Sequence, residues 1–277
     1  MTERPVAIGG ESALRRWTRP VRRTAAWRAV RDPWTFDPRA LRSRARLSAL
    51  RGAHSGRDGV ILATGPSLLR TDFTPYAGMP VIGLNRIYLS AGRIPLRPDY
   101  LVCVNTLMIE QCAADMAALD IPLLVSFAAR RAIGPRARAT FLPAHDGCAF
   151  SRDPRRRVSV GGTVTFAALQ LAWWMGFSTV HLLGVDHAYA LEDHEKGLDP
   201  HAVSERRAED PNHFDGGYFA PGMKWQLPDL AMSERAYANA RAAYEADGRR
   251  VLNGTPGTRL TVFETGSPGV ASPPGGQ

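Results

Sequence analysis

The sequence predicts an α/β fold, a Rossmann-like parallel sheet with helices on both faces. Short apolar runs alternate with stretches that carry apolar residues at helical spacing, a pattern typical of parallel sheets covered on both sides. The expected strands are residues 59–63, 80–84, 99–104, 121–126, 179–185 and 249–252. The expected helices are residues 39–51, 106–119, 163–176 and 233–247.

The composition indicates a globular protein. The 277 residues are 44% hydrophobic and 22% charged, enough for one large domain or two small ones. The longest apolar run, residues 167–177, is about half of the roughly 20 residues that a membrane span needs. Charged residues from Glu3 onward argue against a secretory signal. We therefore expect a cytoplasmic protein, either free or peripheral at the inner face of the membrane.

Residues 1–38 form a basic N-terminal extension broken by prolines. The net charge is +9, and arginines alternate with tryptophans here at Arg15, Arg16, Trp17, Arg19, Arg22, Arg23, Trp27, Arg28, Arg31 and Trp34. The extension is either a solvated or self-packed arm or a segment that rests on anionic lipid headgroups. No nucleic-acid motif accompanies the charge, so we expect no nucleic-acid partner.

The main domain is expected to span residues 39–265, followed by a disordered Gly/Pro/Ser-rich tail at 266–277. Residues 189–228 are polar, rich in His, Asp, Gly and Pro, and longer than a usual connection. We interpret this stretch as a lid-like insertion, with disorder as the alternative.

A glycine corner follows the first expected strand. In Thr64-Gly65-Pro66-Ser67 the glycine permits a tight turn and the proline favours a first helical turn, whose free amides would face an anion. Thr64 and Ser67 add hydroxyls to such a site. The alternative is a generic strand-turn-helix corner, because neither a Walker lysine nor GxGxxG follows it.

Asparagines end the next two expected strands. Asn85 and Asn105 come at the carboxyl ends, the edge along which parallel sheets bind ligands, although each is also a common turn residue. These positions together predict a nucleotide or donor site at that edge.

A second glycine corner, Gly161-Gly162-Thr163, opens a helix that is apolar on nearly every side. It offers either a second anion site or close packing of a buried helix. The next strand ends at Gly184-Val185, placing Asp186 and Tyr189 at the same edge, where the tyrosine hydroxyl is suited to a departing phosphate.

His213 is the candidate acid/base. It lies among aromatic residues, and an unperturbed imidazole with a pKa near 6.5 accepts a proton at neutral pH. The alternative is a structural histidine that fixes the loop by hydrogen bonding to its backbone. The acids and histidines of this region show no metal-ligand spacing, and the isolated Cys103, Cys112 and Cys148 fit structural thiols, so we expect no metal site.

Read in order, these motifs resemble the MptE-like domains, named after the archaeal 6-hydroxymethylpterin diphosphokinase. The resemblance spans about residues 41–263 and rests on Gly65-Pro66-Ser67-Leu68, Gly83-Leu84-Asn85-Arg86-Ile87-Tyr88, Gly184-Val185-Asp186-His187 and Asp210-Pro211-Asn212-His213-Phe214. A more distant resemblance is to single-domain bacterial sialyltransferases that use CMP-sugars. It implies donor contacts at Asn85 and Asn105, a catalytic base at His213 and a phosphate contact at Tyr189.

The sequence departs from the sialyltransferase pattern at two points. Ala63-Thr64 replaces that family's Gly-Asn, and its second phosphate tyrosine has no clear counterpart, although Tyr218 is a substitute. These resemblances imply three functions. The first is sugar transfer from a CMP-sugar to a hydroxyl acceptor in surface polysaccharide or glycan synthesis, without a metal. The others are diphosphate transfer from ATP to a pterin-like alcohol with Mg²⁺ at Asp186, and non-catalytic nucleotide binding.

Overall fold

The computed structural model describes residues 32–134 and 138–269, so the basic arm up to Arg31 and the tail from residue 270 lie outside the described residues. The chain divides after Leu41 into two compact units. Described residues of the first unit include α3 (Pro33–Phe36) and the start of α4 (Pro38–Ala49). The second unit, residues 42–277, carries the sheet and is the subject below.

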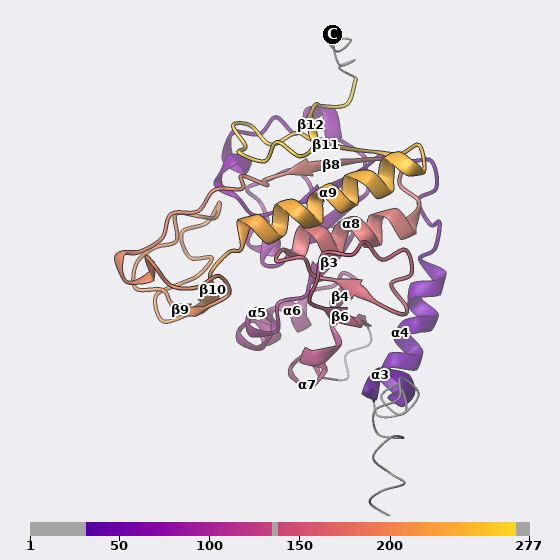
Figure 1. Ribbon diagram of the computed structural model, residues 1–277, viewed down its shortest axis with the longest axis horizontal. Helices are drawn as coiled ribbons and strands as arrows, with labels where there is room; N and C mark the ends of the chain where they lie inside the picture. The colour runs from indigo at the N-terminus through magenta and orange to yellow at the C-terminus, as the bar shows by residue number, and fades with distance from the viewer. Residues whose placement is uncertain (1–31, 135–137, 270–277) are drawn as a thin grey trace, which may run out of the picture. The chain divides into compact units, whose positions relative to one another are not determined.

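One parallel sheet of eight strands forms the centre of the second unit within the described residues (Figure 1). The strands are β1 (Gly59–Leu62), β2 (Val81–Leu84), β3 (Tyr100–Cys103), β4 (Leu123–Ser126), β5 (Ala139–Leu142), β8 (Thr179–Leu183), β11 (Arg250–Asn253) and β12 (Glu264–Thr265). All six predicted strands are present. The short β5 and β12 at the two edges were not predicted.

The strand order, β12-β11-β8-β1-β2-β3-β4-β5, contains one reversal. From β1 the chain builds outward through β2 to β5, then returns to the other side of β1 with β8. The carboxyl ends of β1 and β8 therefore flank a topological switch point, the place where open α/β sheets form a ligand crevice.

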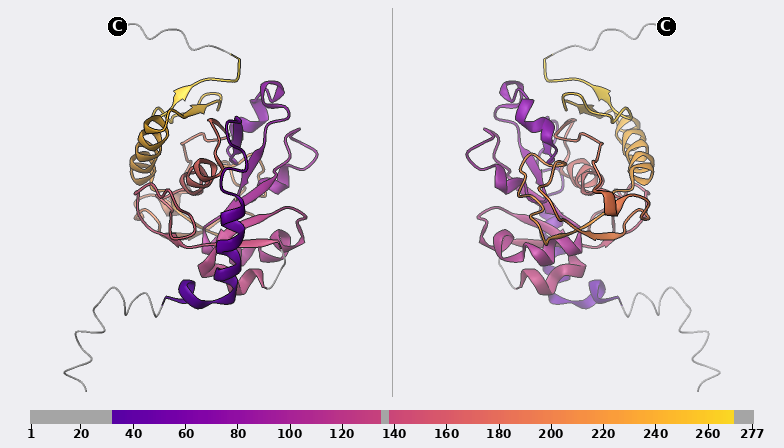
Figure 2. Two further views of the ribbon diagram at one scale, coloured as in Figure 1. Left: turned by 90° about the vertical axis from the view of Figure 1, so that its right-hand side faces the viewer. Right: turned by 90° about the vertical axis from the view of Figure 1, so that its left-hand side faces the viewer.

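Helices and short helical turns flank the sheet, as predicted. α8 (Val164–Met175) packs on β1, β2 and β3, while α9 (Leu230–Ala246) packs on α8 and β11. Figure 2 shows α9 and the connections that follow β1 and β2 on opposite sides. The remaining helical elements are η1 (Pro66–Arg70), η2 (Thr74–Tyr76), η3 (Ile87–Ser90), α5 (Thr106–Gln111), α6 (Ala113–Ala118), η4 (Phe127–Ala129) and α7 (Arg130–Ile133). The single helix predicted over 106–119 is broken at Cys112 into α5 and α6.

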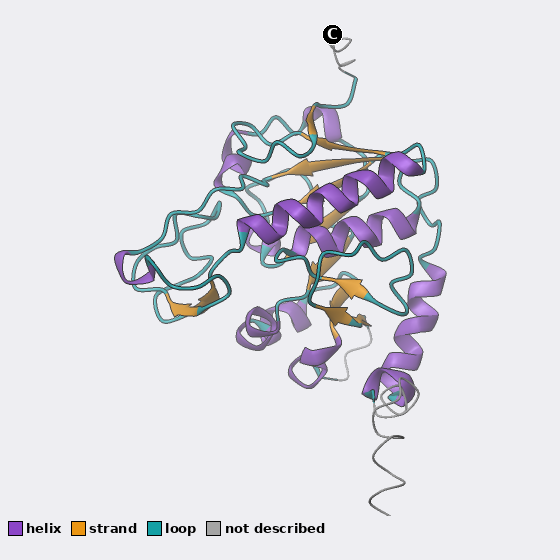
Figure 3. Ribbon diagram, in the orientation of Figure 1, coloured by secondary structure: helices purple, strands orange, loops and turns teal. Residues whose placement is uncertain are grey.

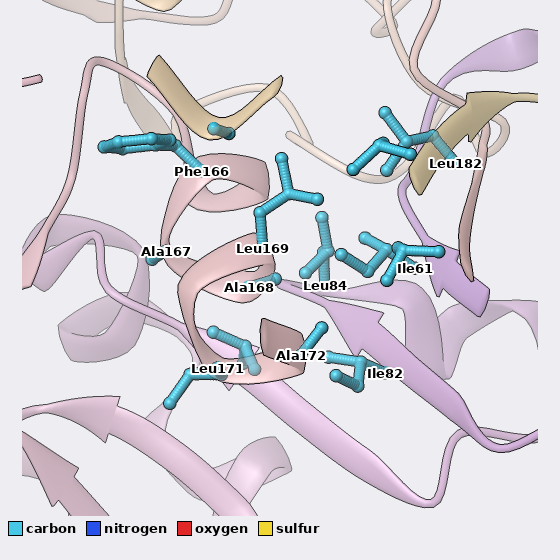
Figure 4. Packing of buried hydrophobic residues seen from close by; sticks show 14 of the residues in the cluster. Ile61, Ile82, Leu84, Phe166, Ala167, Ala168, Leu169, Leu171, Ala172 and Leu182 are labelled. Carbon is cyan, nitrogen blue, oxygen red and sulfur yellow. The ribbon is translucent and has the colours of Figure 1, made fainter. Parts of the chain in front are cut away.

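The α8 helix is the centre of the hydrophobic core. Its side chains are buried on nearly every side, as its sequence predicts, because it lies between the sheet and α9. Figure 4 shows Leu169 and Ala172 of α8 lying toward Ile61, Ile82 and Leu84 of the strands. Burying a side chain such as leucine contributes about 1.5–3 kcal/mol, so this contact anchors the domain.

The side chain of Gln170 in α8 is fully buried, and both its amide oxygen and its nitrogen are hydrogen-bonded. The Gln170 amide oxygen accepts from the backbone amides of Ser151 and Ser159, each at 3.0 Å. Its nitrogen donates to the carbonyls of Ser159 and Phe166 at 2.7 and 2.9 Å. These bonds fasten the segment before α8 to the helix, with β6 (Ala144–His145) and β7 (Val158–Ser159) pairing beside it.

We expect Gln170→Leu to destabilise the protein by about 2–4 kcal/mol, because buried amides and carbonyls lose their partners while the side-chain volume stays similar. Urea unfolding measures the change. The matched control Gln226→Leu removes an exposed glutamine and should change stability by no more than about 0.5 kcal/mol. Equal stability of the two variants would contradict the role assigned to the Gln170 bonds.

Residues 189–228, hereafter the lobe, are folded. Figure 3 shows mostly loop, with the turn η5 (Asp193–Glu195) and a hairpin of β9 (Val203–Glu205) and β10 (Lys224–Gln226). A buried ion pair forms its centre: Arg206 Nη1 lies 3.4 Å from Glu195 Oε2, and Trp225 donates to Glu195 Oε1 at 2.6 Å. Although burial opposes it, the hydrogen bond from Trp225 helps lower the pKa of Glu195. Of the two alternatives, the structure therefore favours an ordered insertion.

Candidate functional site

The glycine corner after β1 is occupied by the protein's own acid. The Ser67 hydroxyl donates to Asp186 Oδ2 at 2.7 Å and the Ser67 amide to Asp186 Oδ1 at 3.2 Å, while the Gly65 amide donates to the Gly184 carbonyl. The expectation of free amides here is therefore wrong for Gly65 and Ser67. The turn that Pro66 opens is the five-residue 3-10 helix η1 rather than a long α-helix.

Space, and not backbone conformation, explains the glycine at position 65. Its φ of −69° is open to any residue, but a Cβ there would lie 1.8 Å from Asp186 Oδ2 and 2.6 Å from the Gly184 carbonyl. Across the corner, Gly184 has φ +72°, and a Cβ there would lie 2.7 Å from Leu68 Cγ. The two glycines thus let the ends of β1 and β8 approach closely enough for the Ser67 to Asp186 bonds.

Two adjoining cavities open at the carboxyl edge of the sheet. The smaller, about 100 Å³, lies at the ends of β1 and β8; the larger, about 560 Å³, extends toward α5 and the lobe. Both are lined by Asn85, Gly162, Thr163, Tyr189 and His213. The second volume lies within the usual range for small-ligand pockets.

Most sequence-predicted residues meet at these cavities. Those lining one or both are Thr64, Gly65, Asn85, Asn105, Gly162, Thr163, Asp186, Tyr189, His213 and Tyr218. Pro66, Ser67 and Gly161 line neither. Ser67 is fully buried beneath the corner, and a Cβ on Gly161 would lie 2.5 Å from Ala236 Cβ, so that glycine serves helix packing.

His213 and Asp210 form a dyad in the wall of the cleft. His213 Nδ1 lies 2.6 Å from Asp210 Oδ2, and the Asp210 side chain is 1% exposed. Asp210 Oδ1 accepts from the Asn212 amide at 2.9 Å, which fixes the carboxylate. With Nδ1–H directed at Asp210, Nε2 is the lone-pair nitrogen, so the ring is arranged as a general base.

The orienting role of Asp210 was not predicted. The i, i+3 spacing in Asp210-Pro211-Asn212-His213 carries the signal, because one tight turn brings the carboxylate to the imidazole. The Asn212 side chain fastens that turn by exchanging two hydrogen bonds with the Ala190 backbone, at 2.7 and 2.9 Å.

Tyr218 supports the histidine ring. The two rings stack with centroids 3.7 Å apart and planes 7° from parallel. Tyr218 is fully buried, and its hydroxyl has no hydrogen-bond partner among the described residues. Burial raises its pKa far above the usual range, against smaller opposing effects of the nearby Thr64 and Asn85. This environment fits a supporting residue; the predicted phosphate contact stays a prediction.

Arg86 joins the end of β2 to the lobe. Its guanidinium donates to the carbonyls of Gly217 and Tyr218 and lies over the Tyr218 ring, 5.8 Å from the centroid. The residue is only 9% exposed, and no carboxylate pairs with it in the described part of the chain. The cation therefore acts on lobe carbonyls, and through Tyr218 on the position of His213.

The two asparagines have different roles. Asn105 caps α5, its Oδ1 accepting from the Met108 amide at 3.1 Å, which is the turn-forming alternative. Asn85 has φ +51°, and its Oδ1 is buried without a partner among the described residues. Asn85 is near enough to the Tyr218 hydroxyl to lower its pKa, so the two unpaired groups adjoin each other at the cleft.

The N-terminus of α8 faces both cavities. Gly161 and Gly162 have φ values of +57° and +73°, and Thr163 caps the helix by accepting from the Thr165 amide. The Val164 amide has no acceptor among the described residues. This end of a buried helix, with a free amide, is suited to an anion.

The charge of the cleft contrasts with that of the chain. The protein carries a net charge of +9, yet in the described residues no lysine or arginine lines either cavity. One carboxylate lines each, Asp186 in the smaller and Asp146 in the larger. Residues 32–134 and 138–269 contain no group of three His, Cys, Asp or Glu side chains placed to hold a metal ion.

No family model matches the chain, and no curated protein matches it. Solved structures are similar to the chain at low identity. The MAf glycosyltransferase from Magnetospirillum magneticum AMB-1 is 16% identical with a TM-score of 0.46, over 83% of this chain and 38% of that one. The sialyltransferase CstII from Campylobacter jejuni with CMP-3FNeuAc is 14% identical with a TM-score of 0.42, over 77% and 86%.

These likenesses concern the fold only. The chain spans well under half of the MAf glycosyltransferase. Within the described residues, we find no helix with the length and apolar character needed to cross a bilayer.

We expect Arg86→Ala to loosen the lobe, because two carbonyl bonds from a charged donor are lost, each worth about 1.5–3 kcal/mol. Amide hydrogen exchange of residues 214–223 should speed up by roughly tenfold or more, while the strands stay protected. The matched control is Arg70→Ala, which removes an exposed arginine at the end of η1. Unchanged exchange in Arg86→Ala would show that Arg86 does not hold the lobe.

Proposed function

We propose that the chain is a transferase that moves a sugar from a CMP-sugar donor to a hydroxyl acceptor, in surface polysaccharide or glycan synthesis. The observation that carries the proposal is the His213–Asp210 dyad in the wall that both cavities share. A base placed between two compartments is what transfer between two bound substrates requires. The ordered sequence motifs support the same reaction.

The electrostatics of the cleft favour a donor with one phosphate. A nucleoside monophosphate sugar presents a single phosphodiester, whereas ATP presents three phosphates, whose transfer chemistry relies on metal ions and basic side chains. This cleft offers neutral groups instead: the Val164 amide at the start of α8, the Thr163 hydroxyl and the Tyr189 hydroxyl. Neutral donors suffice for a leaving group that already carries its negative charge.

In the proposed reaction the acceptor hydroxyl attacks the anomeric carbon of the donor sugar. A new carbon–oxygen bond forms while the bond from that carbon to the phosphate oxygen breaks, and CMP leaves with the electron pair. His213 Nε2 takes the hydroxyl proton, and Asp210 stabilises the resulting imidazolium. Tyr189 and the N-terminus of α8 stabilise the departing phosphate, so this route uses no metal.

Diphosphate transfer from ATP is the rival reaction. It would need Mg²⁺ held by carboxylates, with Asp186 as the first candidate. Both Asp186 oxygens already accept from Ser67, and no second acid lines the smaller cavity in the described chain. The carboxylates at the smaller cavity therefore give Mg²⁺-dependent diphosphate transfer no specific support. Non-catalytic nucleotide binding is the third alternative; it differs from sugar transfer and diphosphate transfer because a nucleotide would bind but no product would form.

The ligand preference tests the donor. We expect CMP to raise the melting temperature by on the order of 5 °C at about 100 times its Kd, with or without Mg²⁺. CDP, ATP and GTP should give smaller shifts, because the cleft lacks basic side chains. A thermal-shift screen of the four nucleotides, each with and without Mg²⁺, measures this. A preference for ATP that depends on Mg²⁺ would reject the CMP-sugar proposal.

The dyad is tested by replacing its members. We expect His213→Ala to lower kcat by roughly 10²- to 10⁴-fold and leave CMP binding near normal, since the ring acts on the acceptor proton. Asp210→Asn should also lower kcat, because an asparagine would no longer hold the His213 ring in the tautomer with its proton on Nδ1. His145→Ala, an exposed histidine outside the cavities, is the control. Full turnover by His213→Ala would remove the ring from the mechanism.

A further inference from the structure

The larger cavity has a lining of a particular chemical kind. Its exposed polar side chains are those of Asp146, His201 and Gln226; Asn105 and Thr106 are half-buried beside them, and Tyr189 lies at the boundary to the smaller cavity. Tyr189 is 43% exposed and packs against Trp225, with centroids 6.4 Å apart. Amides and a hydroxyl both donate and accept hydrogen bonds, and an exposed aromatic ring offers an apolar face.

Within the described residues, Asp146 is the carboxylate of this lining, and its side chain has no ion-pair partner there. Among the described residues no lysine or arginine reaches the cavity, and the two histidines are each beside an acid: His201 is 3.5 Å from Asp229, and His213 is 2.6 Å from Asp210. Asp146 is exposed, and its side chain makes no ion pair with the residues that the structure describes, although Arg157 Nη2 donates to its backbone carbonyl at 3.5 Å. In the described part of the chain, an anionic ligand would thus meet the Asp146 carboxylate and no lysine or arginine, while the lining histidines are each placed beside an acid.

We propose that the larger cavity binds an uncharged saccharide as the acceptor, and that Asp146 excludes acidic sugars. This inference rests on the proposed function and adds the chemical class of the acceptor. Hydroxyl groups match the amides and the hydroxyl of the lining, and the Tyr189 ring is placed to pack on a sugar face. A carboxylate on the sugar would be repelled by Asp146.

The position of the cavity supplies the connection to the reaction. Its boundary with the smaller cavity includes His213, whose Nε2 is not used by Asp210. A saccharide hydroxyl that reaches this boundary lies beside the base, with its remaining hydroxyls toward Asn105 and Gln226. Its proton passes to His213 as its oxygen bonds to the donor carbon.

Binding of two matched sugars tests the proposal without relying on turnover. Methyl β-glucoside and methyl β-glucuronide share one ring and differ in a hydroxymethyl against a carboxylate. Saturation-transfer NMR with the full chain and bound CMP should show the glucoside binding at least tenfold more tightly. Binding of neither sugar, or tighter binding of the glucuronide, would overturn the proposal.

Asp146→Arg should reverse the preference, because a cation replaces the carboxylate at the same exposed position. Asp146→Asn should narrow the difference between the two sugars without reversing it. Melting temperatures of both variants report whether they are folded. An unchanged preference in folded Asp146→Arg would show that another feature selects the sugar.

The donor reaction separates the two proposals. Hydrolysis of CMP-N-acetylneuraminic acid without acceptor reports on the donor side alone. If the glucoside binds but no CMP-sugar binds or is hydrolysed, the proposed function fails while the saccharide site stands. If the donor is hydrolysed and the glucuronide is the better ligand, the saccharide proposal fails while sugar transfer stands.

Discussion

The bond between Asp186 and Ser67 is the constraint on which the site depends. It closes the switch point by joining the end of β8 to the turn after β1, through a hydroxyl and an amide on the same carboxylate. Gly65 is required because any side chain would overlap that carboxylate. The same turn also holds the lobe, since the Thr64 carbonyl accepts from the Phe214 amide at 2.9 Å. One corner of the sheet thus fixes both the crevice and the segment that carries the base.

From that corner the position of His213 follows in steps. The Phe214 amide fixes the residue next to the histidine, Asp210 fixes the imidazole, and Tyr218 covers one ring face. Arg86 then holds Tyr218 through its carbonyl. The lobe is fastened near His213 to the turns after β1 and β2, so this loop residue has the fixed geometry that its proposed role as a general base needs.

The periodicity of the sequence predicted the six inner strands because an inner parallel strand is covered on both faces and reads as an apolar run. It missed β12 because its two residues, Glu264 and Thr265, are exposed at the edge and carry no apolar signal. The site residues were placed at one edge by the rule that parallel strands share their carboxyl ends. The hydrogen bonds of Ser67 and the pairing of Asp210 with His213 depend on side-chain geometry, which strand order does not determine.

The bonds at the β1 corner decide where a phosphate is best placed. A phosphate next to Gly65 would meet the Asp186 carboxylate, and the amides of Gly65 and Ser67 are already used. At the start of α8, by contrast, the Val164 amide has no acceptor in the part of the chain that the structure describes, and the helix dipole is favourable. For the proposed donor phosphate, the second glycine corner is therefore the better place than the first. Such a phosphate would lie between the two cavities, where Tyr189 and His213 also line the wall. In the proposed reaction, the groups that stabilise the departing phosphate and the group that accepts the hydroxyl proton would then lie at the same boundary.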